Sequence, residues 1–493
     1  MEANTLQEII SRAADSYGSQ TAFRYKVKRE LEEKTYEDLH RDTMAFGRML
    51  EEKGMRGKHI AVIGPTSYGW ITSYFGAANS KSVAVPIDVQ LPAEAVCELL
   101  NRADVEMLVF DEGRMDVAEA AASSCPKIRE FLSIQSLPEL LEAYRGEFHC
   151  EVKPEDLCTI LFTSGTTGKS KGVMLTHRNL ADNALCLDMK IPQGTVSLTV
   201  LPINHVYCLT MDIIKGISIG MIICINDSIM RFQRNLKLFQ PEIVLLVPMI
   251  IESLAGKLKE IDPSVPKEQA AAAIFGGKLK TICSGGAYLD PDCIRLFKEF
   301  GITILQGYGM TECSPVISTN LEWENKIGSV GKLLPNCEAK TVDHELWVRG
   351  SSVMQGYYKM PEETAAALED GWLKTGDLGY VDEDRFVFLT GRRKNLIILA
   401  NGENVSPEEL ENELGRNDLV KEILVREHEK VIEAEIFPDP EYMEKHTITE
   451  PKPFLQELVD RLNGSMPVYK RIARLIVREV PFERTAAGKI KRF

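Results

Sequence analysis

A stretch rich in glycine, hydroxyls and lysine, "LFTSGTTGKSKG" at residues 161–172, has the composition of a phosphate-binding loop and overlaps the end of an apolar run, "LCTILF". Glycines let backbone N–H groups approach phosphate oxygens, and Ser and Thr hydroxyls donate further hydrogen bonds. Lys171 would supply positive charge. The stretch contains "GKS", the end of a Walker A loop, but Thr163 stands where such a loop needs its first glycine. The residues therefore predict a phosphate loop that is not that of a P-loop NTPase.

Two further segments carry residue types suited to a nucleotide. In "QGYGMTE" the ring of Tyr308 could stack on a base, and Glu312, next to Thr311, could hold Mg²⁺ beside phosphates. In "WLKTGDLGYVDED" the carboxylate of Asp377 could hold ribose hydroxyls. Taken singly, each is more often an ordinary residue, because Glu after Thr is usually solvated and Asp in a turn is usually structural.

Three basic or titratable residues complete the candidates. Arg392 lies in "GRRKN", a basic break between two apolar segments, and Lys489 lies in the small-residue turn "TAAGKIKR". His205, in "LPINHVY", follows a predicted strand at the same sheet edge as the glycine-rich loops. A lysine near a chain terminus is normally just solvated, so Lys489 is a candidate only because the other segments are also present.

Composition limits the class of protein. The chain has 493 residues, which suggests two or three domains, and its 44% hydrophobic and 26% charged residues are ordinary for a globular protein. The net charge of −14 argues against a nucleic-acid partner held by a general basic surface. Eleven scattered cysteines without a C-x-x-C pair indicate reduced, buried thiols in the cytoplasm. The most apolar run, residues 216–225, is about half a membrane span and is interpreted as a buried strand.

The elements that must position these residues follow an alternating pattern. Apolar runs such as "HIAVIG", "SVAVPID" and "EIVLLVP" alternate with helical spacing up to about residue 310, which predicts βαβ units and mostly parallel sheets covered by helices. The three glycine-rich stretches each follow a predicted strand. Since ligands bind at the carboxyl ends of parallel strands, these three loops are expected at one sheet edge.

The pattern changes after about residue 327, where "IGSVGK", "ELWVRGSSVM" and "RFVFLTGRRKNLIIL" look like short strands with turns and predict a small β barrel or sheet. Beyond "GRRKN", Ser406 before Pro407 with Glu409 three residues later predicts a capped helix start. Two alternating strands, a helix and a last strand then predict a small α+β domain of about 100 residues.

Taken in order, the segments "TSGTTGKSKGV", "LPINHVY", "SGGAYL", "QGYGMTECSP", "GWLKTGDLGYVDED", "GRRKNLIILANGENVSPEELE" and "TAAGKIKR" resemble the signature blocks of the adenylate-forming superfamily. That superfamily contains acyl-CoA synthetases, luciferases and the adenylation domains of peptide synthetases, and the resemblance covers nearly the whole chain. It implies that the glycine-rich loop holds the β- and γ-phosphates of ATP in a ligase. It also implies an α/β fold: a large N-terminal domain of layered, mostly parallel sheets with a small distorted β-barrel, and a small mobile α+β C-terminal domain.

The resemblance carries the following roles onto this chain. The phosphate loop would comprise Thr163, Ser164, Gly165, Thr166, Thr167, Gly168 and Lys171, and adenine would lie among Gly286, Ala287, Gly307, Tyr308 and Gly309. Thr311 would touch phosphate, Glu312 would hold Mg²⁺, and Asp377 would hold the ribose with Arg392 beside it. Lys394 would be the hinge, and His205 and Lys489 would act at the acyl carboxylate.

The resemblance also implies the domain boundaries and the mechanism. Residues 1–390 would form the adenylation domain, 391–396 the hinge and 397–493 the mobile C-terminal domain. ATP would convert a carboxylic acid into an acyl-adenylate, with Lys489 bridging the carboxylate and the α-phosphate. The small domain would then swing, and a thiol would displace AMP.

The acid and the thiol are less defined. The residues of the signature blocks look most like those of bacterial medium- or long-chain fatty acyl-CoA synthetases, which would use CoA as the thiol. Val206, Tyr207 and Thr210 are the candidates for the acyl pocket. Asp212 and Lys215 are expected at the surface or in a structural role. One alternative is a stand-alone enzyme that loads an acyl, aryl or amino acid onto a carrier protein. The other, from a different class, is a non-catalytic nucleotide sensor. The residues do not define the oligomeric state or the length of the acyl chain of the substrate.

Overall fold

The computed structural model describes residues 3–28, 30–163, 170–399, 404–429, 431–484 and 490–492. By its internal contacts the chain divides into two units. Unit 1 comprises Met1–Ala339, Val348–Leu373 and Glu383–Phe386, and unit 2 comprises Lys340–Trp347, Lys374–Asp382 and Val387–Phe493. The division therefore crosses a β-rich segment several times. The domain boundaries expected from the sequence, with a hinge at 391–396, stay a prediction.

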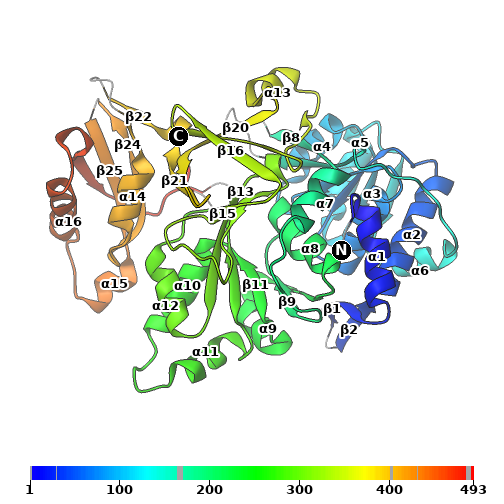
Figure 1. Ribbon diagram of the computed structural model, residues 1–493, viewed down its shortest axis with the longest axis horizontal. Coiled ribbons are helices and arrows are strands. Elements are labelled where there is room, and N and C mark those ends of the chain that lie inside the picture. The colour runs from blue at the N-terminus through cyan, green and yellow to red at the C-terminus, as the bar shows by residue number, and fades with distance from the viewer. Residues whose placement is uncertain are drawn as a thin grey trace. The chain divides into compact units, whose positions relative to one another are not determined.

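The larger sheet of unit 1 has nine strands in the order β15–β14–β13–β12–β11–β9–β10–β1–β2 (Figure 1), and the run from β13 to β1 is parallel. Its continuous apolar strands are buried, as expected where helices cover a parallel sheet. The core includes Phe275 and Phe297 from the helices and Leu198 and Ile282 from the strands. The strands are β1 (Thr21–Val27), β2 (Glu30–Thr35), β9 (Val196–Thr199), β10 (Ile222–Ile225), β11 (Ile243–Leu246), β12 (Thr281–Ser284), β13 (Thr303–Gly309), β14 (Val316–Thr319) and β15 (Lys332–Leu333), and the helices of this core are α9 (Phe232–Phe239), α10 (Pro248–Lys259), α11 (Lys267–Phe275) and α12 (Pro291–Glu299).

The second sheet of unit 1 has seven strands in the order β18–β8–β7–β4–β3–β5–β6. Strands β7, β4, β3, β5 and β6 run parallel, whereas β8 turns back antiparallel on β7. Its core packs Leu100 and Val117 from the helices on Val85 and Leu108 from the strands. The strands are β3 (His59–Ile63), β4 (Val83–Ile87), β5 (Val105–Phe110), β6 (Glu130–Ser133), β7 (Leu157–Thr163), β8 (Lys171–Thr176) and β18 (Gly356–Tyr357), and the two helices are α4 (Ala93–Arg102) and α5 (Met115–Ser124).

The remaining helices of unit 1 include one correction. The run 216–225, expected to be one buried strand, begins as helix: α8 ends at Ser218, and Gly220 turns the chain at φ +74° toward β10. A glycine at such an angle ends a helix at low cost, so the apolar run contains two buried elements. These helices are α1 (Leu6–Tyr17), α2 (Tyr36–Glu52), α3 (Tyr68–Ala78), α6 (Leu137–Ala143), α7 (His177–Leu185), α8 (Lys215–Ser218) and α13 (Pro361–Ala367).

The β-rich segment after residue 327 forms a five-stranded sheet in the order β16–β17–β20–β19, with β21 also paired to β20. The expected strand at "IGSVGK" is wrong except for its last residue, which begins β15, because Gly328 and Gly331 turn the chain at positive φ. The strands are β16 (Cys337–Val342), β17 (Glu345–Gly350), β19 (Leu368–Glu369), β20 (Trp372–Val381) and β21 (Val387–Arg392).

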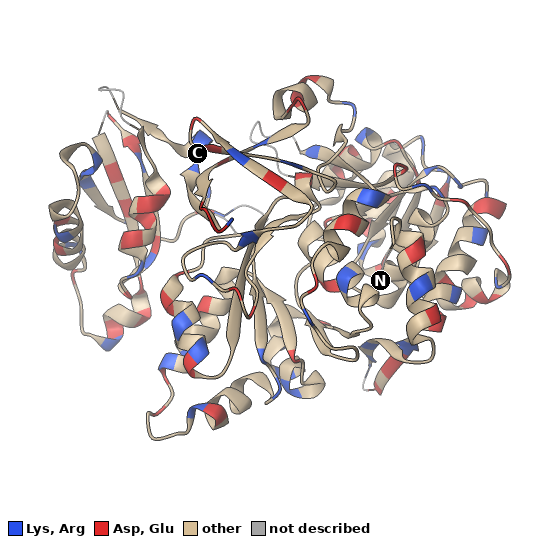
Figure 2. Ribbon diagram, in the orientation of Figure 1, with Lys and Arg blue, Asp and Glu red and all other residues tan. Residues whose placement is uncertain are grey.

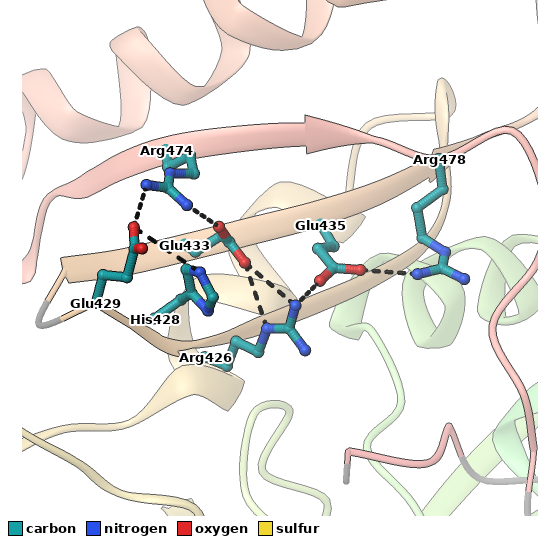
Figure 3. Close-up of polar contacts among 7 residues, drawn as sticks. All are labelled: Arg426, His428, Glu429, Glu433, Glu435, Arg474 and Arg478. Carbon is teal, nitrogen blue, oxygen red and sulfur yellow. Dashed lines mark hydrogen bonds and ion pairs between the residues drawn. The ribbon is translucent and has the colours of Figure 1, made fainter.

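The C-terminal part of unit 2 is a three-stranded sheet with α14 and α16 packed into its core. Strand β25 supplies Ile432, Ala434 and Ile436 to that core. The alternate residues Glu433 and Glu435 are also almost fully buried, and Arg426, Arg474 and Arg478 pair with them (Figure 3). The sheet therefore has one apolar face and one face of neutralised charges. The elements are β22 (Ile397–Ile398), β23 (Asn404–Val405), α14 (Pro407–Gly415), β24 (Val420–His428), β25 (Val431–Pro438), α15 (Pro440–Lys445), α16 (Lys452–Gly464) and β26 (Ile472–Val477).

The helix at Ser406 begins where the sequence predicts, with Pro407 as its first residue, but the predicted capping box is wrong. No capping hydrogen bond is made by the Ser406 side chain within the described part of the chain, and its hydroxyl instead donates to Glu408 Oε2 at 3.1 Å. The fold class is confirmed: mostly parallel sheets covered by helices, followed by a small α+β domain.

Acidic and basic residues are interspersed along the helices of both units (Figure 2). All eleven cysteines are described, and none forms a disulfide. Among the described residues, none of the helices has the length and apolar character required to cross a membrane.

Candidate active site

The predicted phosphate loop connects two antiparallel strands. Thr163 ends β7, Lys171 begins β8, and these two residues pair directly across the ladder. Ser164, Gly165, Thr166, Thr167 and Gly168 lie outside the described residues. A Walker A loop leads from a strand into a helix, whereas this chain returns along the same sheet. The hairpin therefore agrees with the expectation that the loop is not that of a P-loop NTPase.

The second candidate segment follows β13 in the other sheet of unit 1. Thr311 and Glu312 lie on a single 3₁₀ turn, η5 (Thr311–Cys313). Gly309 makes this turn possible, because a Cβ at that position would overlap the Pro315 carbonyl oxygen. The Met310 N–H donates to that same oxygen at 2.9 Å. The expectation that the three glycine-rich loops share one sheet edge is therefore wrong: one belongs to the seven-stranded sheet and two to the nine-stranded sheet.

Helix α7 holds this turn through a residue that sequence reasoning missed. The buried Asn183 amide lies 2.8 Å from the Val316 carbonyl and 3.2 Å from the Cys313 carbonyl, and its oxygen accepts the Val316 N–H at 3.1 Å. The same Nδ2 atom lies 3.1 Å from Ser352 Oγ. An Asn inside a predicted helix carries no local signal of such a role, because its partners lie about 130 to 170 residues away in sequence.

The candidate phosphate lysine and the candidate metal carboxylate share a neighbour, Tyr357. The Tyr357 hydroxyl donates to Glu312 Oε1 at 2.8 Å, and Lys171 Nζ lies 4.8 Å from the centre of the Tyr357 ring. Burial, and secondarily the Glu312 carboxylate, raises the pKa of Tyr357 well above its usual value, so that the hydroxyl stays a donor. The structure thus brings Lys171 and Glu312 together across two sheets. Nothing in "GYYK" distinguishes Tyr357 from its neighbour Tyr358 in advance.

The predicted adenine site lies at the ends of two adjacent parallel strands. Ser284 on β12 and Gln306 on β13 are in register, so Gly286 and Tyr308 stand two residues beyond the same point. Gly286 and Ala287 are exposed, and Gly286 has φ +86°, which favours glycine. Tyr308 is buried, with 8% of its surface exposed. Gly307 and Gly309 flank it within β13.

His205 is exposed at the start of a helical segment that continues into a π-helix, η3 (Cys208–Ile214). Of the pocket candidates, Val206 and Thr210 are buried and Tyr207 is partly buried. The expectation of a surface position for Asp212 and Lys215 is wrong, because 3% and 5% of their surfaces are exposed. Lys215 Nζ donates to the Leu187 carbonyl at 2.7 Å, which fits a structural role.

The predicted ribose residues lie in unit 2 and contact each other. Asp377 on β20 and Arg392 on β21 are paired in the ladder, and Arg392 Nε lies 3.0 Å from Asp377 Oδ1. Asp377 is 4% exposed. Next to this pair, the buried Glu345 accepts the Gly376 N–H at 2.8 Å and pairs with Arg393 at 2.6 Å. The paired strands β20 and β21 therefore hold the Asp377 carboxylate next to a positive charge from Arg392.

Lys394, the predicted hinge, is exposed in a 3₁₀ turn, η6 (Arg393–Asn395). Partial loss of solvent, together with the positive charges of Arg392 and Arg492, lowers the pKa of Lys394 below its usual value. Lys489 lies outside the described residues.

The chain on both sides of Lys489 is anchored within unit 2. Arg484 and Ile490 form a β-bridge, and Glu422 accepts the Phe482 N–H at 2.7 Å and Arg484 Nη2 at 2.6 Å. Arg492 pairs through both terminal nitrogens with Glu411, whose side chain is 12% exposed. These contacts, which sequence reasoning missed, hold the two ends of the segment that carries Lys489.

The donor set fits Mg²⁺ rather than a protein-enclosed metal. Within the described part of the chain, no group of three or more His, Cys, Asp or Glu side chains could hold a metal ion. Mg²⁺ at nucleotide sites takes one or two carboxylates and completes its shell with phosphates and water. The Glu312 carboxylate accepts a hydrogen bond from the Tyr357 hydroxyl and could serve as a carboxylate ligand of that kind.

Comparison with known proteins identifies the family. The model of the AMP-binding enzyme family matches residues 10–358, and the model of the AMP-binding enzyme C-terminal domain matches residues 394–493. The chain belongs to the AMP-binding enzymes, within the adenylate-forming superfamily that its segments resemble.

The individual proteins compared below are 20–28% identical to this chain. The chain is 28% identical to a long-chain-fatty-acid–CoA ligase, FadD15, of Mycobacterium bovis, over 79% of this chain and 74% of that protein. It is also 28% identical to a 2-succinylbenzoate–CoA ligase of Bacillus cereus, over 93% of this chain and 97% of that protein. Among solved structures, an anthranilate–CoA ligase with bound anthranoyl-AMP has the same fold, with a TM-score of 0.85 at 20% identity over 99% and 95% of the two chains. A Bacillus subtilis o-succinylbenzoate–CoA synthetase, solved with ATP and magnesium, has a TM-score of 0.80 at 24% identity over 98% of each chain.

Proposed function

We propose that the chain is an AMP-forming acid–thiol ligase that activates a fatty acid with ATP and transfers the acyl group to CoA. The observation that carries this proposal is that Glu312 and Lys171, which begins the second strand of the glycine-rich hairpin, both contact Tyr357 in a member of the AMP-binding enzymes. A carboxylate for a metal and a lysine for phosphate are the two charges that phosphoryl chemistry at ATP requires.

In the first step the substrate carboxylate attacks the α-phosphorus of ATP. A carboxylate–phosphorus bond forms, the bond to the β-phosphate breaks, and pyrophosphate leaves. Thr163 to Gly168 and Lys171 would hold the departing phosphates, Glu312 would hold Mg²⁺, and Asp377 would hold the ribose with Arg392 beside it. Mg²⁺ supplies positive charge that stabilises the negative charge on the phosphates. Lys489 offsets the charge that develops between the carboxylate and the α-phosphate.

In the second step a thiol attacks the carbonyl of the acyl-adenylate. The carbon–sulfur bond forms, the carbon–oxygen bond to AMP breaks, AMP leaves, and the thiol proton is released to water. His205, exposed beyond the end of β9, is assigned to the acyl carboxylate and the path of the thiol. The free cysteines, eight of which are buried, support a reducing, cytoplasmic setting for this chemistry.

The choice of acid and of thiol comes from the relatives and from the signature segments. The relatives above act on fatty acid and on succinylbenzoate, and both are 28% identical to this chain. Both are CoA ligases, which favours CoA over a carrier protein. A fatty acid is proposed as the substrate because the residues of the signature segments look most like those of fatty acyl-CoA synthetases.

The test is acid-dependent release of pyrophosphate with a panel of fatty, aryl and amino acids, with and without CoA. Turnover that needs both a fatty acid and CoA is the expected result. Pyrophosphate exchange without turnover on CoA would indicate a carrier protein as acceptor. Absence of activity with every acid would contradict the ligase and restore the nucleotide sensor.

A further inference from the structure

Tyr357 contacts two groups that the proposed mechanism uses but that lie in different sheets. Its hydroxyl lies 2.8 Å from Oε1 of Glu312, which lies on the turn that follows β13 of the nine-stranded sheet. Its ring centre lies 4.8 Å from Nζ of Lys171, which begins β8 of the seven-stranded sheet. Tyr357 and Glu312 are 7% and 9% exposed, so the hydrogen bond between them is shielded from water, whereas Lys171 is half-buried. One side chain therefore joins the two sheets at the candidate ATP site.

The backbone fixes Tyr357 independently of these two contacts. Tyr357 pairs with Val173 in the ladder between β18 and β8, and its N–H donates to Thr364 Oγ1 at 2.9 Å. Three residues earlier, the Met354 N–H donates to the Glu312 carbonyl at 2.9 Å. The short segment 354–357 thus holds Glu312 by its backbone at one end and by its carboxylate at the other.

The physical consequence concerns orientation. A buried carboxylate that accepts a hydroxyl is restricted to few rotamers, and groups that orient metal ligands typically change metal affinity by about 10- to 100-fold when removed. A lysine ammonium within about 6 Å of a ring centre is attracted to the ring face. The first contact bears on Mg²⁺, and the second bears on where Lys171 rests.

We propose that Tyr357 is a positioning residue for ATP binding and adenylation, whose hydroxyl orients Glu312 for Mg²⁺ and whose ring holds Lys171 beside the phosphate hairpin. This inference rests on the proposed function, because it takes Glu312 as the Mg²⁺ carboxylate and Lys171 as a phosphate ligand. It adds to that function a residue that neither the segments nor the family match singles out.

The experiment uses two variants that separate the two contacts. Tyr357→Phe removes the hydroxyl and keeps the ring, and Tyr357→Leu removes both. Binding of ATP to the full chain is measured by calorimetry over a series of Mg²⁺ concentrations, without acid or CoA. We expect Tyr357→Phe to raise the Mg²⁺ concentration for half-maximal binding by about tenfold, with ATP affinity restored at high Mg²⁺. Tyr357→Leu should in addition weaken ATP at saturating Mg²⁺.

Tyr358→Phe is the matched control. It removes the hydroxyl of the adjacent tyrosine, which donates to Asp104 at 2.6 Å, outside the contacts of Glu312 and Lys171 described above. Its Mg²⁺ dependence should equal that of the wild type. Thermal unfolding without ligand identifies a loss of fold in any variant, and Tyr357→Phe, which keeps the shape of the side chain, carries the test if Tyr357→Leu does not fold.

The outcomes separate the two claims. If the wild type binds ATP with Mg²⁺ and Tyr357→Phe shows the same Mg²⁺ dependence, the positioning role is wrong while the proposed function stands. If the wild type shows no Mg²⁺-dependent ATP binding at all, the proposed function fails, and this inference fails with it.

Discussion

At the scale of single residues, Asp377 is the clearest candidate for a direct contact with nucleotide. It is almost fully buried and pairs with Arg392, while the N–H of the preceding Gly376 donates to Glu345. Burial of a carboxylate is costly unless partners satisfy it. An ion pair at 3.0 Å with Arg392 orients the Asp377 carboxylate, and a carboxylate can accept hydrogen bonds from both hydroxyls of a ribose.

We expect Asp377→Ala to raise the KM for ATP by roughly 10- to 100-fold, since hydrogen bonds to a charged group contribute about 1.5–3 kcal/mol. The measurement compares ATP with 2′,3′-dideoxy-ATP. The wild type should discriminate strongly between them, and the variant should not. Equal discrimination in both proteins would mean that Asp377 does not contact the ribose.

Asp212 leads to a prediction about pH. Burial raises its pKa from 3.8 to about 6, although the hydroxyls of Thr199 and Ser197 beside it offset part of that shift. A carboxyl with a higher pKa in the folded protein binds its proton more tightly there, so it favours the folded state at low pH. This contribution is lost as pH rises from about 4 through 6, and it amounts to about 3 kcal/mol for a shift of about two units.

We therefore expect Asp212→Asn, which cannot ionise, to gain stability relative to the wild type as pH rises. The difference in free energy of unfolding should grow by up to about 3 kcal/mol between pH 4 and pH 8, measured by urea denaturation. Comparing the two proteins at each pH removes the effect of all other titrating groups. A difference that stays constant with pH would mean that Asp212 is not a buried carboxyl with a raised pKa.

At the scale of elements, α7 and the turn η5 depend on each other. Asn183 satisfies the backbone around the turn that carries Thr311 and Glu312. Asn183→Ala should destabilise the protein by about 2–3 kcal/mol, because it leaves buried backbone groups without partners. It should also lower the rate of pyrophosphate exchange, since the turn that carries Glu312 loosens.

Asn101→Ala is the control for this substitution. Asn101 is exposed and donates to the Ser124 carbonyl at 3.0 Å, so its loss should change stability by no more than about 0.5 kcal/mol. Urea denaturation and pyrophosphate exchange are measured on both variants. An Asn183→Ala protein as stable and as active as Asn101→Ala would contradict the role given to α7.

The elements also show what the sequence could and could not predict. The strand at 59–63 and the helix at 407–415 are confirmed, because apolar periodicity and a proline at the first helical turn are local signals. The division of the glycine-rich loops between two sheets could not be predicted, because strand order depends on long-range pairing. The Tyr357 hydroxyl and the Asn183 amide were missed for the same reason: their partners lie 45 and about 130 residues away in sequence.

At the scale of the whole molecule, the candidate residues are distributed over both units. Glu312 and Lys171 belong to unit 1, and Asp377 and Arg392 belong to unit 2. Lys489 lies on a segment of unit 2 whose two ends are anchored by Glu422 and Glu411. The resemblance assigned Lys489 to adenylation alone, whereas the thiol step needs other residues. The two half-reactions should therefore respond differently to changes in this segment.

We expect Lys489→Ala to abolish formation of the acyl-adenylate and to spare thioester formation from a supplied acyl-adenylate. Arg492→Ala should have a weaker effect of the same kind, because it keeps Lys489 but releases the ion pair with Glu411 that anchors the segment. Lys491→Ala is the control, since Lys491 pairs at 3.1 Å with Glu483, whose side chain is 83% exposed, and its side chain contributes little to anchoring. Each half-reaction is measured separately, by pyrophosphate exchange and by thioester release. Equal loss of both half-reactions in Lys489→Ala would contradict a lysine that serves one step, and would mean that the segment supports the site as a whole.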